Sequence, residues 1–217
     1  MIISPGRKYI FVHIPKTGGT SLALALEARA MADDILIGDT PKAVKRRARV
    51  KKLQGERRLW KHSSLSDVEG MPGVGRLEDY LVVTLIRNPW DRMVSYYHWL
   101  RGQTFAHRAV ELAKAHEFTD FLRHPEMALS LKAERYAQYV ENSANLEVNT
   151  LFIDLKKSKN EIDEFERHLG FSLDLPQANA SGRDPDWRRY FSDADAALVG
   201  QLYAEDIARF GYHFDPD

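Results

Sequence analysis

Two runs of nearly continuous apolar residues predict buried β-strands, at residues 8–14 and 80–86, and residues 148–153 are a third candidate strand. Runs of this length that are rich in β-favouring residues are typical of strands buried on both faces of a sheet. The first two runs end at short turns, and helix-favouring sequence begins directly after them at Thr20 and Pro89. The pattern therefore predicts two units of strand, turn and helix.

The remaining sequence is mostly helical in its spacing. Residues 107–145 predict several short helices, and residues 159–169 predict an amphipathic helix that Gly170 ends. A last helix is expected over residues 193–210, with Ser192 as its N-cap. Strands that alternate with helices indicate an α/β fold, in which helices flank a central parallel sheet.

Composition narrows the class of protein. The chain has 217 residues, 44% of them hydrophobic, which is enough for one domain over residues 1–217 with a sizeable core. Lys and Arg number 31, as do Asp and Glu, so a net charge of zero gives no support for binding nucleic acid or an anionic membrane. The absence of cysteine excludes a disulfide scaffold, a thiolate metal site and a cysteine nucleophile. The apolar run at residues 9–14 is too short for a signal-peptide core or a membrane span, so we expect a cytoplasmic protein.

One stretch of the chain is strongly basic. Residues 41–61 contain a single acid, Glu56, and ten basic residues: Lys42, Lys45, Arg46, Arg47, Arg49, Lys51, Lys52, Arg57, Arg58 and Lys61. A solvated helix face is one interpretation, and a surface for an anionic substrate is the other. Because the whole chain is neutral, this local excess of positive charge makes the molecule electrically asymmetric.

The turn after the first strand has the composition of a phosphate-binding loop. It reads PKTGGTS over residues 15–21, where two glycines allow close approach of the backbone and the following helix begins. Lys16 adds a cation, and the Thr and Ser hydroxyls add donors. The order differs from a Walker A loop, in which the lysine follows the glycines, and no Walker-type Asp for magnesium is evident. A tight turn with a fortuitous lysine is the alternative interpretation.

The turn after the second strand offers another anion site. Arg87 ends that strand, and Ser95 follows eight residues later in the next helix. Arginine binds phosphate in a bidentate manner, and ligands of parallel sheets bind outside the carboxyl ends of the strands. Two anion sites at one sheet edge indicate a ligand with two separated phosphate-like groups.

These residues resemble a known family. FVHIPKTGGTSL resembles the 5′-phosphosulfate loop of carbohydrate-type sulfotransferases, and LIRNPWDRMVSYYHWL is similar to their 3′-phosphate motif. The segments NASGR and WRRYFSDADAALVGQLYAEDIARFGYHF are similar to the closing part of bacterial members, so the resemblance spans residues 8–214, with the middle third least diagnostic. It implies a P-loop-like three-layer domain that uses 3′-phosphoadenosine 5′-phosphosulfate as its co-substrate, without a metal.

The resemblance also assigns residues to that co-substrate. Six loop residues would hold the 5′-phosphosulfate: Lys16, Thr17, Gly18, Gly19, Thr20 and Ser21. Lys16 would also stabilise charge on the leaving phosphate. Arg87 and Ser95 would hold the 3′-phosphate, and Arg183 is similar in position to basic residues that close over the cofactor.

The acceptor hydroxyl needs a general base, for which histidine is the usual choice near neutral pH. His62 occupies the place where heparan-type 2-O-sulfotransferases carry a base histidine, and a surface or capping histidine is the alternative. Asp or Glu serves as base in other branches of the superfamily. His13 lies inside the first strand and is interpreted as structural, whereas Trp60 is a candidate for stacking on the acceptor.

Together these features predict a sulfotransferase that acts on a hydroxyl acceptor, which we expect to be a saccharide. Two alternatives stay open: a P-loop-type kinase or nucleotide-binding protein, and a non-catalytic nucleotide-binding module. The residues identify neither the particular acceptor nor the oligomeric state.

Overall fold

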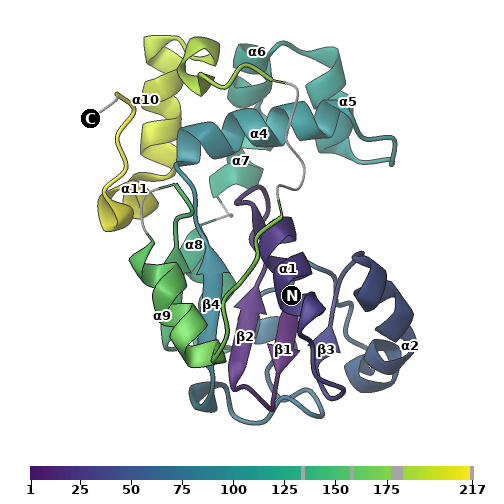
Figure 1. Cartoon of the computed structure of the whole chain (residues 1–217). Coiled ribbons are helices and arrows are strands. Elements are labelled where there is room, and N and C mark those ends of the chain that lie inside the picture. Colours follow the sequence, from purple (N-terminus) through teal and green to yellow (C-terminus); the bar gives the residue numbers. More distant parts are fainter. Residues whose placement is uncertain (133–134, 157–158, 177–182, 216–217) are drawn as a thin grey trace. The chain divides into compact units, whose positions relative to one another are not determined.

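The structure is a computed structural model that describes residues 1–132, 135–156, 159–176 and 183–215 (Figure 1). The chain divides into two compact units. The first comprises Met1–Ile86 with Tyr136–Asn179, and the second comprises Arg87–Arg135 with Ala180–Asp217. The first unit contains the sheet, and the second is helical.

The first unit is built on a five-stranded sheet of order β3-β1-β2-β4-β5. Its strands are β1 (Ile2–Ser4), β2 (Tyr9–Val12), β3 (Ile35–Leu36), β4 (Leu81–Leu85) and β5 (Thr150–Ile153). Strands β2, β4 and β5 are parallel, with Val12 opposite Thr84 and Thr84 opposite Phe152. Strand β1 runs antiparallel to both β2 and β3.

The three predicted strands are confirmed as the parallel part of the sheet, but the sheet as a whole is mixed. Strands β1 and β3 did not stand out in the sequence because they are only three and two residues long. A short turn at residues 5–8 joins β1 to β2, and a connection that short permits only an antiparallel pair. The α/β fold class is confirmed, and the expectation of a wholly parallel sheet is corrected at these two strands.

Helices cover both faces of the sheet in the first unit (Figure 1). Helices α1 (Gly19–Ala28) and α9 (Asn160–Leu169) pack on the face formed by Phe11, Val83 and Ile153. The opposite face, formed by Ile10 and Val82, packs against α3 (Leu65–Val68), α8 (Tyr136–Val140) and part of α2 (Pro41–Gln54). Because successive side chains of a strand point to opposite faces, each strand contributes to two hydrophobic cores, one on each face of the sheet. A short 3₁₀ helix, η1 (Leu77–Asp79), precedes β4.

The second unit consists of helices. They are α4 (Pro89–Arg101), α5 (Arg108–Ala115), α6 (Phe118–Arg123), α7 (Pro125–Lys132), η2 (Trp187–Tyr190), α10 (Asp193–Leu202) and α11 (Ala204–Phe210). Asn88 caps α4, because its side chain accepts hydrogen bonds from the amides of Trp90 and Asp91. The single helix expected over residues 193–210 is instead two, because the chain leaves helical geometry at Tyr203, which is 1% exposed. Within the described part of the chain, no helix has the length and apolar composition needed to cross a bilayer.

Candidate active site

The loop between β2 and α1 folds tightly around the start of the helix. Gly18 is the N-cap of α1 with φ 98°, and Lys16 also lies in the left-handed region with φ 65°. A left-handed lysine is uncommon and costs roughly 1–2 kcal/mol, whereas glycine takes this conformation readily. The Thr17 hydroxyl donates to the carbonyl of Ile14 at 2.9 Å, and the amide of Ser21 donates to the carbonyl of Gly18 at 3.1 Å.

This geometry leaves the helix start suited to an anion. No acidic residue lies in the first turn of α1, and no side chain caps it within the described residues. The helix dipole and the first-turn amides therefore favour a negatively charged ligand, and Lys16 adds a cation beside them. Thr17 is buried, so its hydroxyl shapes the loop through Ile14, while Gly18 is exposed.

Gly19 lies directly against the ring of His13. A Cβ placed on Gly19 would be 2.2 Å from Cδ2 of His13, a distance that real Cβ atoms essentially never show. The His13 ring is 7% exposed and packs against Phe11, with 5.7 Å between ring centroids. The structural interpretation of His13 is therefore supported. The His13 ring determines how closely strand β2 and the loop approach each other.

Replacing Gly19 by Ala is expected to lower the free energy of unfolding by about 1–3 kcal/mol, because the buried His13 ring must move. The same substitution in a His13→Ala background is expected to cost little, since the clashing ring is gone. Urea unfolding of the four proteins of this cycle measures the coupling. Gly38→Ala is the control, because its Cβ would meet Lys61 at an ordinary 3.7 Å. Equal costs of Gly19→Ala in both backgrounds would contradict this packing.

His62 lies next to His13, whose ring separates it from Gly19 of the phosphate-binding loop. Its Nδ1 lies 2.7 Å from the carbonyl oxygen of His13, and the two rings are 4.7 Å apart between centroids. Burial, opposed by the hydrogen bond to His13, lowers the pKa of His62 to about 4, and burial also holds the pKa of His13 well below its ordinary value. His62 is therefore neutral at pH 7. Because a carbonyl only accepts, Nδ1 carries the hydrogen and Nε2 carries the lone pair.

Nuclear magnetic resonance of ¹⁵N-labelled imidazole rings is expected to show His62 as the Nδ1–H tautomer at pH 7. Protonation should begin only as the pH falls towards 4, because burial favours the neutral ring. The folded state accordingly loses stability as the pH falls from about 6.5, where the unfolded ring protonates, through the folded value. A His62 resonance that titrates between pH 6 and 7, or an Nε2–H tautomer, would contradict the assignment.

Trp60 extends this ring cluster towards solvent. Its ring is 59% exposed, and its centroid lies 4.9 Å from that of His62 in an edge-on arrangement. An exposed tryptophan of this kind presents a flat apolar face with little conformational freedom. His13, His62 and Trp60 thus form a row of rings that leads from the loop to the surface.

Arg87 lies in the second unit and is fixed by a carboxylate. Its Nε and Nη2 donate to the two oxygens of Asp91 at 2.8 Å each, and the Asp91 side chain is 1% exposed. Arg183 also donates to Asp91. These three side chains together carry one positive charge, so the cluster favours an anion even though the carboxylate is part of it.

Ser95 follows Asp91 by one helical turn on α4, so both side chains lie on the same face of the helix. Ser95 is 7% exposed. The structure therefore brings the predicted residues together in two groups, each within its own unit. Lys16, the rest of its loop and His62 form the first group, and Arg87, Arg183 and Ser95 form the second.

Sequence reasoning missed the role of Asp91. The spacing of Arg87 and Asp91 by four residues was the available signal, because that spacing allows a side-chain ion pair. The packing of His13 against Gly19 left no signal in the sequence, since it depends on the approach of strand and loop in three dimensions.

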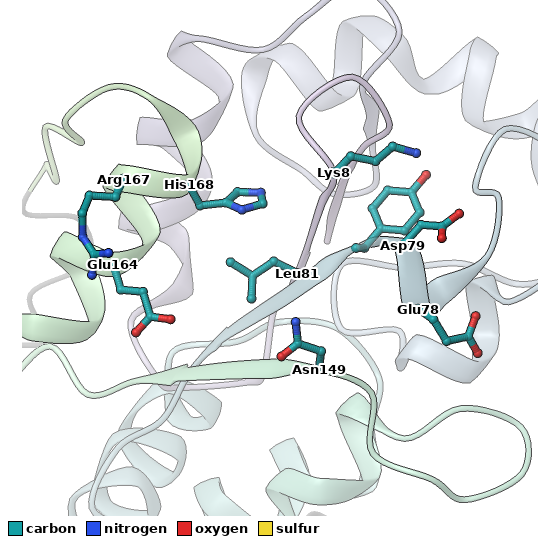
Figure 2. Close-up of a pocket in the computed structure, with 9 residues that line it drawn as sticks. Lys8, Glu78, Asp79, Leu81, Asn149, Glu164, Arg167 and His168 are labelled. Carbon is teal, nitrogen blue, oxygen red and sulfur yellow. The ribbon is translucent and has the colours of Figure 1, made fainter.

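A cavity lies at the amino ends of the parallel strands, away from the phosphate-binding loop at their carboxyl ends (Figure 2). Its volume is about 510 Å³, and it lies where Lys8, Leu81 and Asn149 stand at the amino ends of β2, β4 and β5. Figure 2 shows His168 and Glu164 of α9 on one side of Leu81 and Lys8 on the other. Ligands of α/β sheets bind at the carboxyl ends of the strands, and this cavity mixes both signs of charge, so it is not the candidate site.

Comparison with known proteins agrees with the fold. The profile of a family described as "Sulfotransferase family" matches residues 1–213. Among solved structures, the chain is similar to the crystal structure of mouse sulfotransferase SULT7A1 complexed with PAP, with 16% sequence identity and a TM-score of 0.54, over 94% of this chain and 86% of that one. A comparison with curated proteins found no match. Identity this low shows the fold alone, but the family profile covers almost the whole sequence, and the chain therefore belongs to the sulfotransferase family.

Proposed function

We propose that this protein transfers a sulfuryl group from 3′-phosphoadenosine 5′-phosphosulfate to a hydroxyl group of a saccharide, without a metal. The observation that carries the proposal is the loop of residues 15–21, which places the amino end of α1 and Lys16 after a central parallel strand. The family membership supports sulfuryl transfer, and the bound PAP of the mouse enzyme supports this donor.

The loop fits the phosphosulfate end of the donor. The first-turn amides of α1 point along the helix axis towards an anion, and Gly18 has no Cβ to obstruct its approach. Thr20 and Ser21 are half-buried at the helix start and add hydroxyl donors. Lys16 stabilises the negative charge that develops on the phosphate side of the breaking bond, which makes it the main electrostatic contributor to the reaction.

Arg87, Ser95 and Arg183 bind the 3′-phosphate in this proposal. Asp91 holds the Arg87 guanidinium by two hydrogen bonds, so the arginine loses little freedom when it binds a ligand. Arg183 shares that carboxylate and is 8% exposed, which fits a cation that closes over a bound anion. The match of the family profile to residues 1–213, which belong to both units, supports the expectation that residues 1–217 form one functional domain.

His62 acts as the general base. Its Nε2 lone pair accepts the proton of the acceptor hydroxyl, while the His13 carbonyl fixes the ring orientation through Nδ1. The lowered pKa keeps this nitrogen unprotonated over the whole physiological range. Trp60, exposed beside His62, is suited to stack on a sugar ring, and this supports a saccharide acceptor.

An assay with ³⁵S-labelled donor and a panel of neutral and acidic oligosaccharides tests the proposed function. We expect label to appear in a saccharide, with one equivalent of adenosine 3′,5′-bisphosphate released per transfer and no requirement for magnesium. Binding of the bisphosphate without transfer to any hydroxyl acceptor would instead favour a non-catalytic nucleotide-binding module.

A further inference from the structure

A groove runs beside the proposed base in the first unit. Its volume is about 440 Å³, and it is bounded by α2, by β3 with residues 37–39, and by residues 59–61. Its apolar floor includes Ile37, Ala43 and Val50. The groove belongs entirely to the first unit, as do His62 and the phosphate-binding loop.

The basic side chains of α2 separate into three faces of the helix. Lys42, Arg46 and Arg49 lie on one face and donate to backbone carbonyls of Glu27 and residues 31–34, so they attach the helix to the preceding loop. Arg47 and Lys51, spaced by four residues, line the groove. Lys45 and Lys52 are exposed; they do not line the groove and do not take part in the contacts with the preceding loop.

The groove carries a net positive charge. Its charged lining consists of Arg47, Lys51, Lys61 and Asp39. Lys61 binds Asp39 at 2.6 Å, which neutralises the carboxylate. For Arg47 and Lys51 there is no hydrogen bond or ion pair within the described residues, so their charges are available to an anion at the groove.

An aromatic platform stands at the end of the groove nearest the proposed base. Trp60 lines the groove, is 59% exposed and contacts His62. A sugar ring stacked on Trp60 would therefore lie beside the imidazole, and the groove would hold the neighbouring sugar units. Cations placed along such a groove match the carboxylate groups of an acidic saccharide.

We propose that this groove is the acceptor-binding site, and that Arg47 and Lys51 select an acidic saccharide by binding a carboxylate on a sugar next to the one that reacts. The inference rests on the proposed function. It assigns Trp60 to stacking and the two cations to specificity, and it assigns Lys42, Arg46 and Arg49 to attachment of α2.

Calorimetry with defined probes tests this assignment in the presence of saturating adenosine 3′,5′-bisphosphate. The probes are hexasaccharides of galacturonic acid, of mannuronic acid and of hyaluronan, each paired with its carboxyl-reduced form. At least one acidic probe is expected to bind, and its carboxyl-reduced partner should bind about tenfold more weakly or worse. The preference should shrink as salt is added, because the cations are exposed.

Two double variants localise the effect. Arg47→Ala with Lys51→Ala is expected to weaken the acidic probe about tenfold and to leave its carboxyl-reduced form nearly unchanged. Lys45→Ala with Lys52→Ala removes the same charge from the same helix and should leave both affinities nearly unchanged. Trp60→Ala should weaken both forms together, since stacking does not depend on the carboxylate.

Each other outcome overturns the inference. Equal binding of the acidic and carboxyl-reduced probes would show that the groove does not select for charge. Equal losses of affinity in the two double variants would show that only the overall positive charge of α2 matters, and not the positions of Arg47 and Lys51. No binding of any acidic probe, while adenosine 3′,5′-bisphosphate still binds, overturns the groove assignment and leaves the proposed function intact. Failure to bind the bisphosphate overturns the proposed function itself, and the groove assignment with it.

Discussion

Replacing Lys16 by Ala is expected to lower the rate of sulfuryl transfer by about a hundredfold or more, with little change in folding. In the proposed reaction the ammonium group acts on charge that develops at the leaving phosphate, so its removal should raise the barrier more than it weakens donor binding. The side chain is only half-buried at a turn, and it contributes little to either core of the sheet. Turnover at saturating donor and acceptor is the quantity to measure.

The left-handed backbone at Lys16 supplies a sharper version of this test. Lys16→Gly removes the same charge and also relieves the cost of φ 65°, so this variant should unfold at the same or a higher urea concentration than the wild type. It should nevertheless be as slow as Lys16→Ala. Lys45→Ala removes a charge from an exposed helix face and should retain full activity. A folded Lys16→Gly protein with normal turnover would remove Lys16 from the mechanism.

Loss of the His62 imidazole is expected to lower turnover by about 10²- to 10⁴-fold, the range typical of a missing general base. In the proposed reaction the ring accepts the hydroxyl proton at Nε2. Added imidazole should partly restore the rate of a His62→Gly protein, because the vacated space admits a small base. A purely structural histidine would not show this rescue.

His168→Ala is the matched control for His62. Its Nε2 also binds a backbone carbonyl, that of Arg7 at 2.8 Å, but it lies in the cavity at the amino ends of the strands. Its removal should leave turnover unchanged. If the His62→Gly protein kept its activity, His62 would not be the general base, and an Asp or Glu residue would become the candidate.

The sequence was most informative where one element alone determines the structure. The strands β2 and β4 lie in nearly continuous apolar runs, and Asn88 with Pro89 defines a helix start through local chemistry. The short strands β1 and β3 carry no comparable periodicity. They become visible only in the folded sheet, where β1 pairs with β2 and β3 pairs with β1, which is a tertiary effect.

In the candidate site too, the sequence predicted local features but not those that depend on tertiary packing. The composition of residues 15–21 predicted an anion-binding loop, because glycines, a lysine and a helix start act locally. The sequence alone could not show that His62 contacts the backbone of His13 across 49 residues. Nor could it show which basic residues of α2 attach the helix and which line a groove, since that depends on what each helix face meets.

The central claim is that the protein binds two separate phosphate groups of one donor molecule. Calorimetry with two nucleotides tests this claim most directly. Adenosine 3′,5′-bisphosphate should bind about ten- to a hundredfold more tightly than adenosine 5′-monophosphate, because charged contacts to the 3′-phosphate contribute roughly 1.5–3 kcal/mol each. Arg87→Ala should erase most of that difference and leave the weaker affinity for the monophosphate nearly unchanged. Equal affinities of the wild-type protein for the two nucleotides would contradict the account.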